Sequence, residues 1–279
     1  MNVHLLVIDP QNDFMDLPEK DRPESPDNPG IRSAPALPVP GAHQDMIRLA
    51  AWLDLHRAAV TDVTVTLDHH HRLDIAHPTF WRTGTGEAVG PFTSITLAQL
   101  DRFEFTPAPG LDRDRARAYL AALEDAGRFT HMVWPIHCQI GTWGACVHAG
   151  LQAALDRWED GKVRSVEHVQ KGENPWTEHY SALCAEIPDP TDPATAMDRE
   201  LLTRLAGANL VVVAGEAASH CVRATVEHLV AGWHGDPSRI VLLTDTMSAV
   251  GGFEASWNEF RQEIAARGVR LATTTDLTI

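Results

Sequence analysis

The segment that decides the fold is VVVAGEAASHCVRATVEHLV, residues 211–230. The apolar run at 210–214 is typical of a buried strand that ends at Gly215, and Cys221 opens a stretch whose apolar residues recur at helical spacing. A cysteine at such a strand–loop–helix corner lies at the positive end of a helix, where a thiolate is favoured. The corner alone leaves two interpretations open, a catalytic nucleophile and a buried structural cysteine.

The composition is that of a soluble globular protein. A length of 279 residues fits one large domain or two small ones, and 44% hydrophobic residues suffice for a sizeable core. The formal net charge is -15 and no cluster of basic residues occurs. We therefore expect neither nucleic acid nor an anionic membrane as a partner.

The cysteines and the N-terminal region indicate a cytoplasmic location. None of the four cysteines forms a C-x-x-C pair, which speaks against thioredoxin-like chemistry and zinc ribbons. The apolar run at 2–8 is too short for a signal peptide and has no basic start. No apolar stretch reaches the ~18 residues of a membrane span. Free thiols in a reducing cytoplasm are the expectation.

Predicted strands and helices alternate along the chain. Strands are expected at 3–8, 60–67, 129–133, 163–170, 210–214, 240–243 and 269–273. Helices are expected at 44–58, 111–126, 142–158, 196–206, from Cys221 onward, and at 253–267. Residues 17–41 and most of 72–110 are expected to be loop.

This order predicts an α/β fold with a doubly wound, mostly parallel sheet flanked by helices, a three-layer α/β/α sandwich. We expect a single domain over residues 1–279, with an elaboration at about 83–128.

Reactive side chains follow four of the predicted strands. Asp9 follows LLVI, Asp68 follows TVTL, Lys171 follows EHVQ, and Cys221 follows VVVAG after a short loop. Ligands of open parallel sheets bind beyond the carboxyl ends of the strands. An acid, a lysine and a thiol can thus converge there, as nucleophilic catalysis requires. Taken singly, Asp9 is also typical of a turn cap and Lys171 of a surface charge.

A run of histidines lies beside this set. In an extended backbone Asp68 and His70 face the same way, which places a carboxylate and an imidazole on one side. His77 and His137 follow later in the chain. Such ligands suit a metal site, and the alternative is a surface histidine cluster.

Three other known functional motifs are not matched by this sequence. GTGEAVG at 84–90 lacks the G-x-G-x-x-G spacing of dinucleotide sites and no predicted strand precedes it. His220-Cys221 has no arginine six residues after the cysteine, as a phosphatase loop needs, because position 227 is Glu227. No G-x-S-x-G elbow occurs.

Five motifs in order resemble one known family. They are LLVIDPQNDFM (5–15), TLDHH (66–70), WPIHC (134–138), QKG (170–172) and AGEAASHCV (214–222). The chain resembles the isochorismatase-like cysteine hydrolases, and within them the nicotinamidases, from residue 3 to about residue 250. The resemblance implies a hydrolase of small amides that is a homo-oligomer.

The resemblance also implies roles for individual residues. Cys221 is the nucleophile, Asp9 the base and Lys171 the partner of both. Asp68, His70 and His137 are the ligands of one divalent metal ion, for which Zn, Fe and Mn are candidates. His77 matches a histidine that ligates metal in only some relatives.

Further roles concern the substrate. Phe14 and Trp134 match aromatic walls that enclose a pyridine ring, although aromatic pairs are also common in cores. The backbone N–H groups of Ala217 and Cys221 would hold the oxyanion, and the bond between Glu216 and Ala217 would be cis.

The family does not decide the substrate. The elaboration between Asp68 and Trp134 is expected to border the pocket mouth, as a lid or a subunit contact. Glu216 is acidic where many relatives are apolar. Two alternatives stay open: a hydrolase of the same fold that acts on another small amide or carbamoyl compound, and a non-enzymatic binding or scaffold protein.

Overall fold

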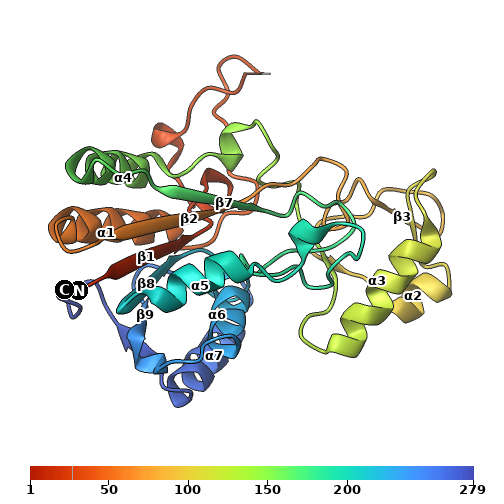
Figure 1. The fold of residues 1–279 in the computed structure, drawn as a ribbon. Helices are drawn as coiled ribbons and strands as arrows, with labels where there is room; N and C mark the ends of the chain where they lie inside the picture. The colour runs from red at the N-terminus through yellow and green to blue at the C-terminus, as the bar shows by residue number, and fades with distance from the viewer. Residues whose placement is uncertain (27) are drawn as a thin grey trace.

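A six-stranded sheet, parallel throughout, forms the centre of the molecule (Figure 1). The structure, a computed structural model, describes residues 1–26 and 28–279. The strand order is β10-β9-β8-β1-β2-β7. The strands are β1 (Val3–Ile8), β2 (Asp62–Asp68), β7 (Glu167–Lys171), β8 (Leu210–Gly215), β9 (Ile240–Leu243) and β10 (Arg270–Ala272). The predicted doubly wound α/β fold is confirmed.

The central strands β1 and β8 are buried along their whole length. Their sequences VHLLVI and LVVVAG are nearly all apolar, as expected for parallel strands covered on both faces. Gly215 ends β8 with φ of 114°, and a Cβ atom there would lie 2.0 Å from the carbonyl oxygen of Ile8. Only glycine fits at this close approach, which sets where the chain leaves the sheet toward Cys221.

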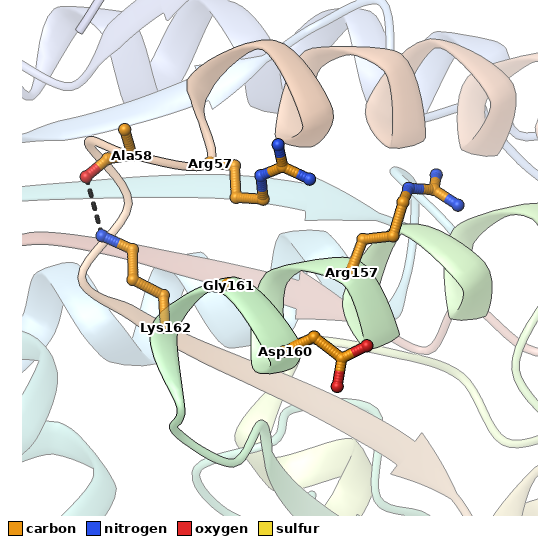
Figure 2. A pocket seen from close by; sticks show the side chains of 6 residues that line it. All are labelled: Arg57, Ala58, Arg157, Asp160, Gly161 and Lys162. Carbon is orange, nitrogen blue, oxygen red and sulfur yellow. Dashed lines mark hydrogen bonds between the residues drawn. The ribbon is translucent and has the colours of Figure 1, made fainter.

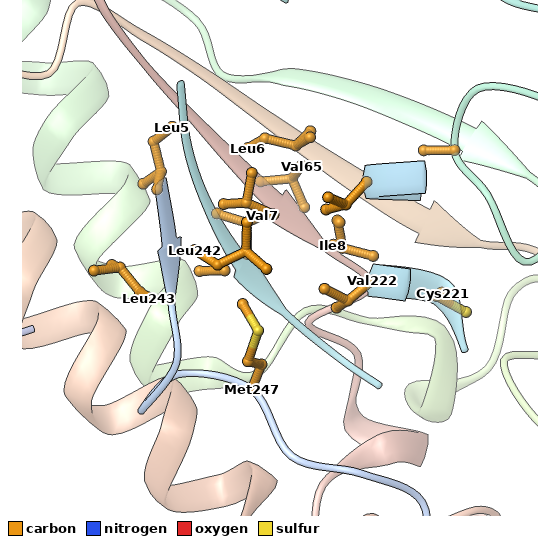
Figure 3. Packing of buried hydrophobic residues seen from close by; sticks show 14 of the residues in the cluster. Leu5, Leu6, Val7, Ile8, Val65, Cys221, Val222, Leu242, Leu243 and Met247 are labelled. Atoms are coloured by element: carbon orange, nitrogen blue, oxygen red, sulfur yellow. The ribbon is translucent and has the colours of Figure 1, made fainter. Parts of the chain in front are cut away.

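Helices cover both faces of the sheet (Figure 1). The helices α1 (Ala42–His56) and α4 (Ala149–Lys162) pack together on one face. The other face carries α5 (Arg199–Gly207), α6 (Cys221–Ala231) and α7 (Glu254–Ala266). Figure 3 shows the apolar side chains of β1 and β9 packed together, with Val222 of α6 and, at the helix start, Cys221. The buried core thus fixes the first turn of α6.

The segment between β2 and α4 forms a separate unit beyond the carboxyl ends of the strands (Figure 1). It contains β3 (Trp81–Thr83), β4 (Thr93–Ser94), α2 (Leu97–Asp101), β5 (Phe105–Pro107), α3 (Arg113–Ala126) and β6 (Met132–Val133). Eleven buried residues between Ile75 and Val133 form its own apolar cluster, which we call the second core. We propose that this unit is an elaboration of one domain.

One sequence prediction for this region is confirmed and one is wrong. Residues 72–110 are mostly loop, as predicted, but they also hold α2 and three short strands, which escaped prediction because elements of two to five residues show no periodicity. The strand predicted at 129–133 is only β6, and it pairs with β4 and not with the central sheet.

The helix predicted at 142–158 also differs from the structure. Its first part is a 3₁₀ turn, Trp143–Ala145, and α4 begins at Ala149. The His148 side chain accepts a hydrogen bond from the N–H of Leu151 and so caps the helix start. A histidine cap is not among the usual cap residues, which hid this boundary. Helices long and apolar enough to cross a membrane are absent from the described part of the chain.

Candidate active site

Four neighbouring strands bring the predicted reactive residues to one edge of the sheet. In the order β8-β1-β2-β7, the strand ends carry Cys221, Asp9, Asp68 and Lys171. Their side chains are all buried. Ligand atoms of Asp9, Asp68 and Cys221 lie within 4.8 Å of one another. The convergence predicted from the strand ends is thus present in the structure.

The ammonium group of Lys171 stands at the centre of this set. Its Nζ lies 2.9 Å from Oδ2 of Asp9 and 3.0 Å from Oδ1 of Asp68. It donates to the carbonyl oxygen of His179 at 2.9 Å and lies 3.7 Å from Sγ of Cys221. Burial disfavours the ammonium, but the carboxylates of Asp68 and Asp9 raise the pKa of Lys171 well above its usual value. Lys171 is therefore charged.

Asp9 keeps one carboxylate oxygen free of hydrogen bonds. Oδ1 accepts a hydrogen bond of 2.5 Å from the hydroxyl of Thr66. Oδ2 is buried and makes the ion pair with Lys171, but it accepts no hydrogen bond from the residues that the structure describes. Burial raises the pKa of Asp9, against the effect of Lys171. Oδ2 is thus an available proton acceptor beside the thiol.

The Cys221 thiol is neutral at rest. Burial raises the pKa of Cys221 well above its usual value; Lys171 acts in the opposite direction, and Asp9 and Asp68 add to the rise. The sequence led us to expect a thiolate favoured by the helix end and by Lys171. Lys171 acts as expected, but burial outweighs it, so a base must remove the proton when the thiol reacts.

Two backbone N–H groups are candidates for an oxyanion site. Cys221 is the first residue of α6, where an N–H has no partner within the helix. Within residues 1–26 and 28–279, neither its N–H nor that of Ala217 donates a hydrogen bond. The bond between Glu216 and Ala217 is cis, as the resemblance implied.

The rings of His70 and His137 both approach the carboxylate of Asp68, the third predicted metal ligand. Its Oδ2 lies 3.1 Å from Nε2 of His70 and 3.4 Å from Nε2 of His137. His137 reaches this place because its segment runs beside His70: the N–H of His70 donates to the carbonyl of Cys138 at 3.1 Å. A carboxylate and two imidazoles at this spacing are a donor set for a divalent transition metal.

Outer contacts fix the two rings in orientations that suit a metal. Nδ1 of His70 lies 3.0 Å from Oδ2 of Asp74, and Nδ1 of His137 lies 2.9 Å from the carbonyl oxygen of Pro135. Each acceptor holds a proton on Nδ1, so Nε2 is the ring nitrogen that faces Asp68. Asp68 and Asp74 raise the pKa of His70 well above its usual value, although burial opposes this, so the His70 ring also carries a proton on Nε2. The residues present therefore fit a metal cation, which would take the place of the Nε2 proton.

His77 lies outside this three-residue set. Its Nδ1 contacts the carbonyl oxygen of His71 at 3.1 Å, and its Nε2 accepts from the N–H of His137 at 3.4 Å. Burial, with His137 and His70, lowers the pKa of His77 to about 2, so the ring is neutral. Nε2 of His77 also lies 3.3 Å from Nδ1 of His137. The His77 ring thus contacts both the backbone N–H and the Nδ1 edge of His137.

A narrow pocket opens onto Cys221 and the metal-ligand set. The predicted walls Phe14 and Trp134 both line it. Its other lining residues are Leu37, Asp68, His137, Glu178, Tyr180, Ala217, His220, Cys221 and Val250. The cavity measures about 20 Å³, room for one water molecule. A substrate can enter only if side chains at the mouth move aside.

Comparison with solved structures identifies the fold. Neither a family model nor a curated protein matches the chain. The yeast nicotinamidase bound to the inhibitor nicotinaldehyde superposes with a TM-score of 0.62 at 18% identity, covering 97% of this chain and 99% of that one. A pyrazinamidase of Pyrococcus horikoshii in complex with zinc gives 0.55 at 19% identity, over 98% and 99% of the chains. An isochorismatase-like hydrolase of Alkaliphilus metalliredigens gives 0.52 at 15%, over 99% and 96%.

The chain has the isochorismatase-like fold. The family resemblance of the sequence motifs and the likeness of the structures agree on this point.

A second pocket of this isochorismatase-like fold lies away from the reactive residues. It is an open surface depression of about 680 Å³ between the end of α1 and the end of α4 (Figure 2). Two of its charged side chains have partners: Lys162 donates to the carbonyl oxygen of Ala58, and Arg157 pairs with Asp54. No member of the reactive set is among its lining residues.

The isochorismatase-like fold also shows what sequence reasoning missed. The elaboration at 83–128 was expected to border the pocket mouth, but none of the described lining residues comes from it. Phe92 only packs edge-on against Trp134 from outside, with ring centres 6.0 Å apart. Glu178 and Tyr180 line the pocket, from the loop after β7. The sequence signal that could have identified Glu178 and Tyr180 was their position, seven and nine residues after Lys171.

Proposed function

We propose that this protein is a metal-containing cysteine amidohydrolase that releases ammonia from a small amide, as nicotinamidases do, through a thioester on Cys221. The observation that carries the proposal is the Lys171 ammonium, buried between Asp9, Asp68 and Cys221. Burying an ion pair costs several kcal/mol per ion unless the charges compensate each other. A thiol within this arrangement is typical of nucleophilic catalysis.

Acylation uses Asp9 as the base. Oδ2 of Asp9 takes the proton from the Cys221 thiol, and Sγ attacks the amide carbonyl carbon. The tetrahedral intermediate then breaks its C–N bond, and Asp9 gives the proton to the leaving nitrogen, which departs as ammonia. The thioester remains on Cys221. Proton transfer by a positioned carboxylate contributes about 10²–10⁴-fold to such a rate.

Deacylation repeats the proton transfer with water. Asp9 takes a proton from water, the hydroxide attacks the thioester carbonyl, and the carboxylic acid leaves as the C–S bond breaks. The Cys221 sulfur then takes the proton back from Asp9. In both halves the N–H groups of Ala217 and Cys221 hold the negative oxygen, since neither has another partner in the described chain.

Asp68, His70 and His137 would hold the metal ion. Bound there, a divalent cation supplies a Lewis acid that orients and polarises a substrate. The donor set suits Zn, Fe and Mn, and the zinc complex of the Pyrococcus horikoshii enzyme supports zinc as one candidate. We propose that His77 keeps His137 in place and is not itself a ligand.

The test is ammonia release from nicotinamide, pyrazinamide and carbamoyl amides. We expect turnover of at least one aromatic amide, a transient thioester detected by mass spectrometry at Cys221, and no turnover by Cys221→Ala. The matched control is Cys146→Ala, which removes an exposed cysteine. Turnover that survives in Cys221→Ala would exclude the proposal, as would a wild-type protein that hydrolyses none of these amides.

A further inference from the structure

One residue that lines the pocket has a buried carboxylate oxygen without a hydrogen-bond partner among the described residues. Oε1 of Glu178 accepts a hydrogen bond of 3.0 Å from the N–H of His179. Oε2 is buried and accepts none from the described residues, although the side chain lines the pocket and Glu178 is only 4% exposed. A buried carboxylate oxygen left without a donor is costly, so its presence at a ligand pocket calls for a donor from the ligand.

Two neighbouring polar side chains of the pocket each have a hydrogen-bond partner. The hydroxyl of Tyr180 accepts from Nε1 of Trp134 at 3.0 Å. Nδ1 of His220 lies 2.9 Å from the hydroxyl of Ser219. Glu178 is thus the lining residue whose acceptor stays open within the described part of the chain.

Glu178 lines the same pocket as Cys221. Its loop follows β7, and the carbonyl oxygen of the next residue, His179, accepts a hydrogen bond from Lys171. The charged groups that act most strongly on Glu178 are His70, Asp68 and Asp74. The carboxylate does not belong to the Asp68–His70–His137 donor set among the described residues. It is therefore available to accept a hydrogen bond from a bound molecule.

We propose that Glu178 is a specificity-determining residue that accepts a hydrogen bond from a donor on the substrate. This inference rests on the proposed function. The substrate is then a small aromatic amide that carries an amino group, a hydroxyl group or a protonated ring nitrogen in addition to the amide. A site built to bind such a donor discriminates strongly against the analogue that lacks it, because the buried acceptor is left unpaired.

The experiment compares amides that match in size and differ in the donor. The probes are nicotinamides with an amino or a methyl group at each free ring carbon. At one ring position we expect the amino compound to exceed the methyl compound at least about tenfold in kcat/KM, the effect of one hydrogen bond to a charged group. Glu178→Gln keeps the size and the acceptor for His179, and it should lower this ratio to about twofold or less.

Controls separate this inference from its alternatives. Glu186→Gln changes a buried glutamate of the same loop outside the pocket and should keep the ratio. Metal content measured on each purified variant should not change. A wild-type protein with no amino preference at any position overturns the inference, and so does a Glu178→Gln variant that keeps the preference or loses the metal.

Binding keeps the two proposals distinguishable. The same amide pairs are titrated calorimetrically into Cys221→Ala and into Cys221→Ala with Glu178→Gln. If no amide is turned over but the amino preference appears in binding and vanishes with Glu178→Gln, the proposed function fails and the inference stands. If amides are turned over without any preference, the inference fails and the proposed function stands.

Discussion

The charges of the buried residues explain why the Cys221 thiol is neutral in the resting site. Asp9 and Asp68 are two buried carboxylates, and Lys171 is the one cation between them. A thiolate on Cys221 would add a further negative charge in the same dry place, which is why the pKa of the thiol is raised. The resting site is a neutral thiol next to a free carboxylate oxygen, and the sulfur is activated only during the reaction.

We predict that Asp9→Asn lowers kcat about 10²–10⁴-fold, because the substitution removes the proton acceptor. In the wild type, kcat/KM should fall with decreasing pH as Asp9 becomes protonated. Since burial raises its pKa, this fall should occur above the usual value of 3.8. A pH–rate profile of ammonia release checks both points.

The variant should lose the acidic limb of that profile. Asp54→Asn serves as the control, because Asp54 is a surface residue paired with Arg157. Wild-type turnover by Asp9→Asn would contradict the assignment of the base.

We predict that Asp74→Asn weakens metal binding about 10–100-fold, because the acceptor that orients His70 becomes an amide group. Chelator competition on the purified protein measures the dissociation constant. Glu173→Gln is the control, because that carboxylate is exposed and lies 4.0 Å from His69, outside the donor set. Equal affinities of wild type and Asp74→Asn would show that Asp74 does not act through His70.

The sequence placed Asp9, Lys171 and Cys221 at one edge of the sheet but not their surroundings. Their positions could be predicted because Asp9 and Lys171 lie at the ends of recognisable strands and Cys221 follows such a strand after a short loop. Glu178 could not, because a loop without periodicity determines where it points. The raised pKa of the thiol was also out of reach, since burial depends on the assembled core. The oligomeric state and the cytoplasmic location stay predictions.

Among the elements, the unit between β2 and α4 depends on its own core. Leu120 of α3 is fully buried in the second core, with Trp81 and Tyr119. The side chain of Asp112 caps the N-terminus of α3, and Gly127, with φ of 64°, ends it. The unit contacts residues that line the pocket at Trp134, through Phe92, and at Glu178, whose N–H donates to the hydroxyl of Tyr119.

We predict that Leu120→Ala destabilises this unit by about 2–5 kcal/mol, the usual cost of a cavity in a core. Hydrogen exchange should become faster for amides between residues 75 and 133, while β1 and β8 keep their protection. Asp125→Ala, which alters an exposed residue of the same helix, is the control. Equally increased exchange in β1 and β8 would mean that the two cores unfold together.

Glu186, in the loop between β7 and α5, gives stability a pH dependence. Burial raises the pKa of Glu186 to about 7, although Arg128 lies 3.3 Å from its carboxylate. The usual value is 4.5, so the folded state holds this proton more tightly than the unfolded state. The stabilising contribution is complete below pH 4.5 and is lost as the pH rises through about 7.

We predict that Glu186→Gln, which stays neutral, is more stable than the wild type at ~pH 8 by about 1–3 kcal/mol and nearly equal to it at ~pH 4. Thermal or denaturant unfolding at the two pH values measures this. The exposed Glu259→Gln should show no such difference. A variant less stable at alkaline pH would mean that the ion pair with Arg128 outweighs burial.

The whole fold was easier to predict than its smaller parts. Continuous apolar runs such as those of β1 and β8 are long enough to recognise, and the right-handed crossover rule then orders the layers. The second core escaped prediction because its strands have two or three residues and pair only with each other. The second core is stabilised by contacts between residues that are distant in sequence, which a local sequence pattern does not show.

The ion-pair centre couples distant parts of the chain during folding. Of the strand pairs that join the reactive residues, β1 and β2 are the nearest in sequence, and their pairing would bring Asp9 and Asp68 together first. Their cation arrives only when β7 docks on β2, and the thiol arrives with β8 on the other side of β1. A half-assembled sheet would thus enclose two like charges without compensation. Lys171 thereby favours all-or-none assembly of the sheet and disfavours partly formed states.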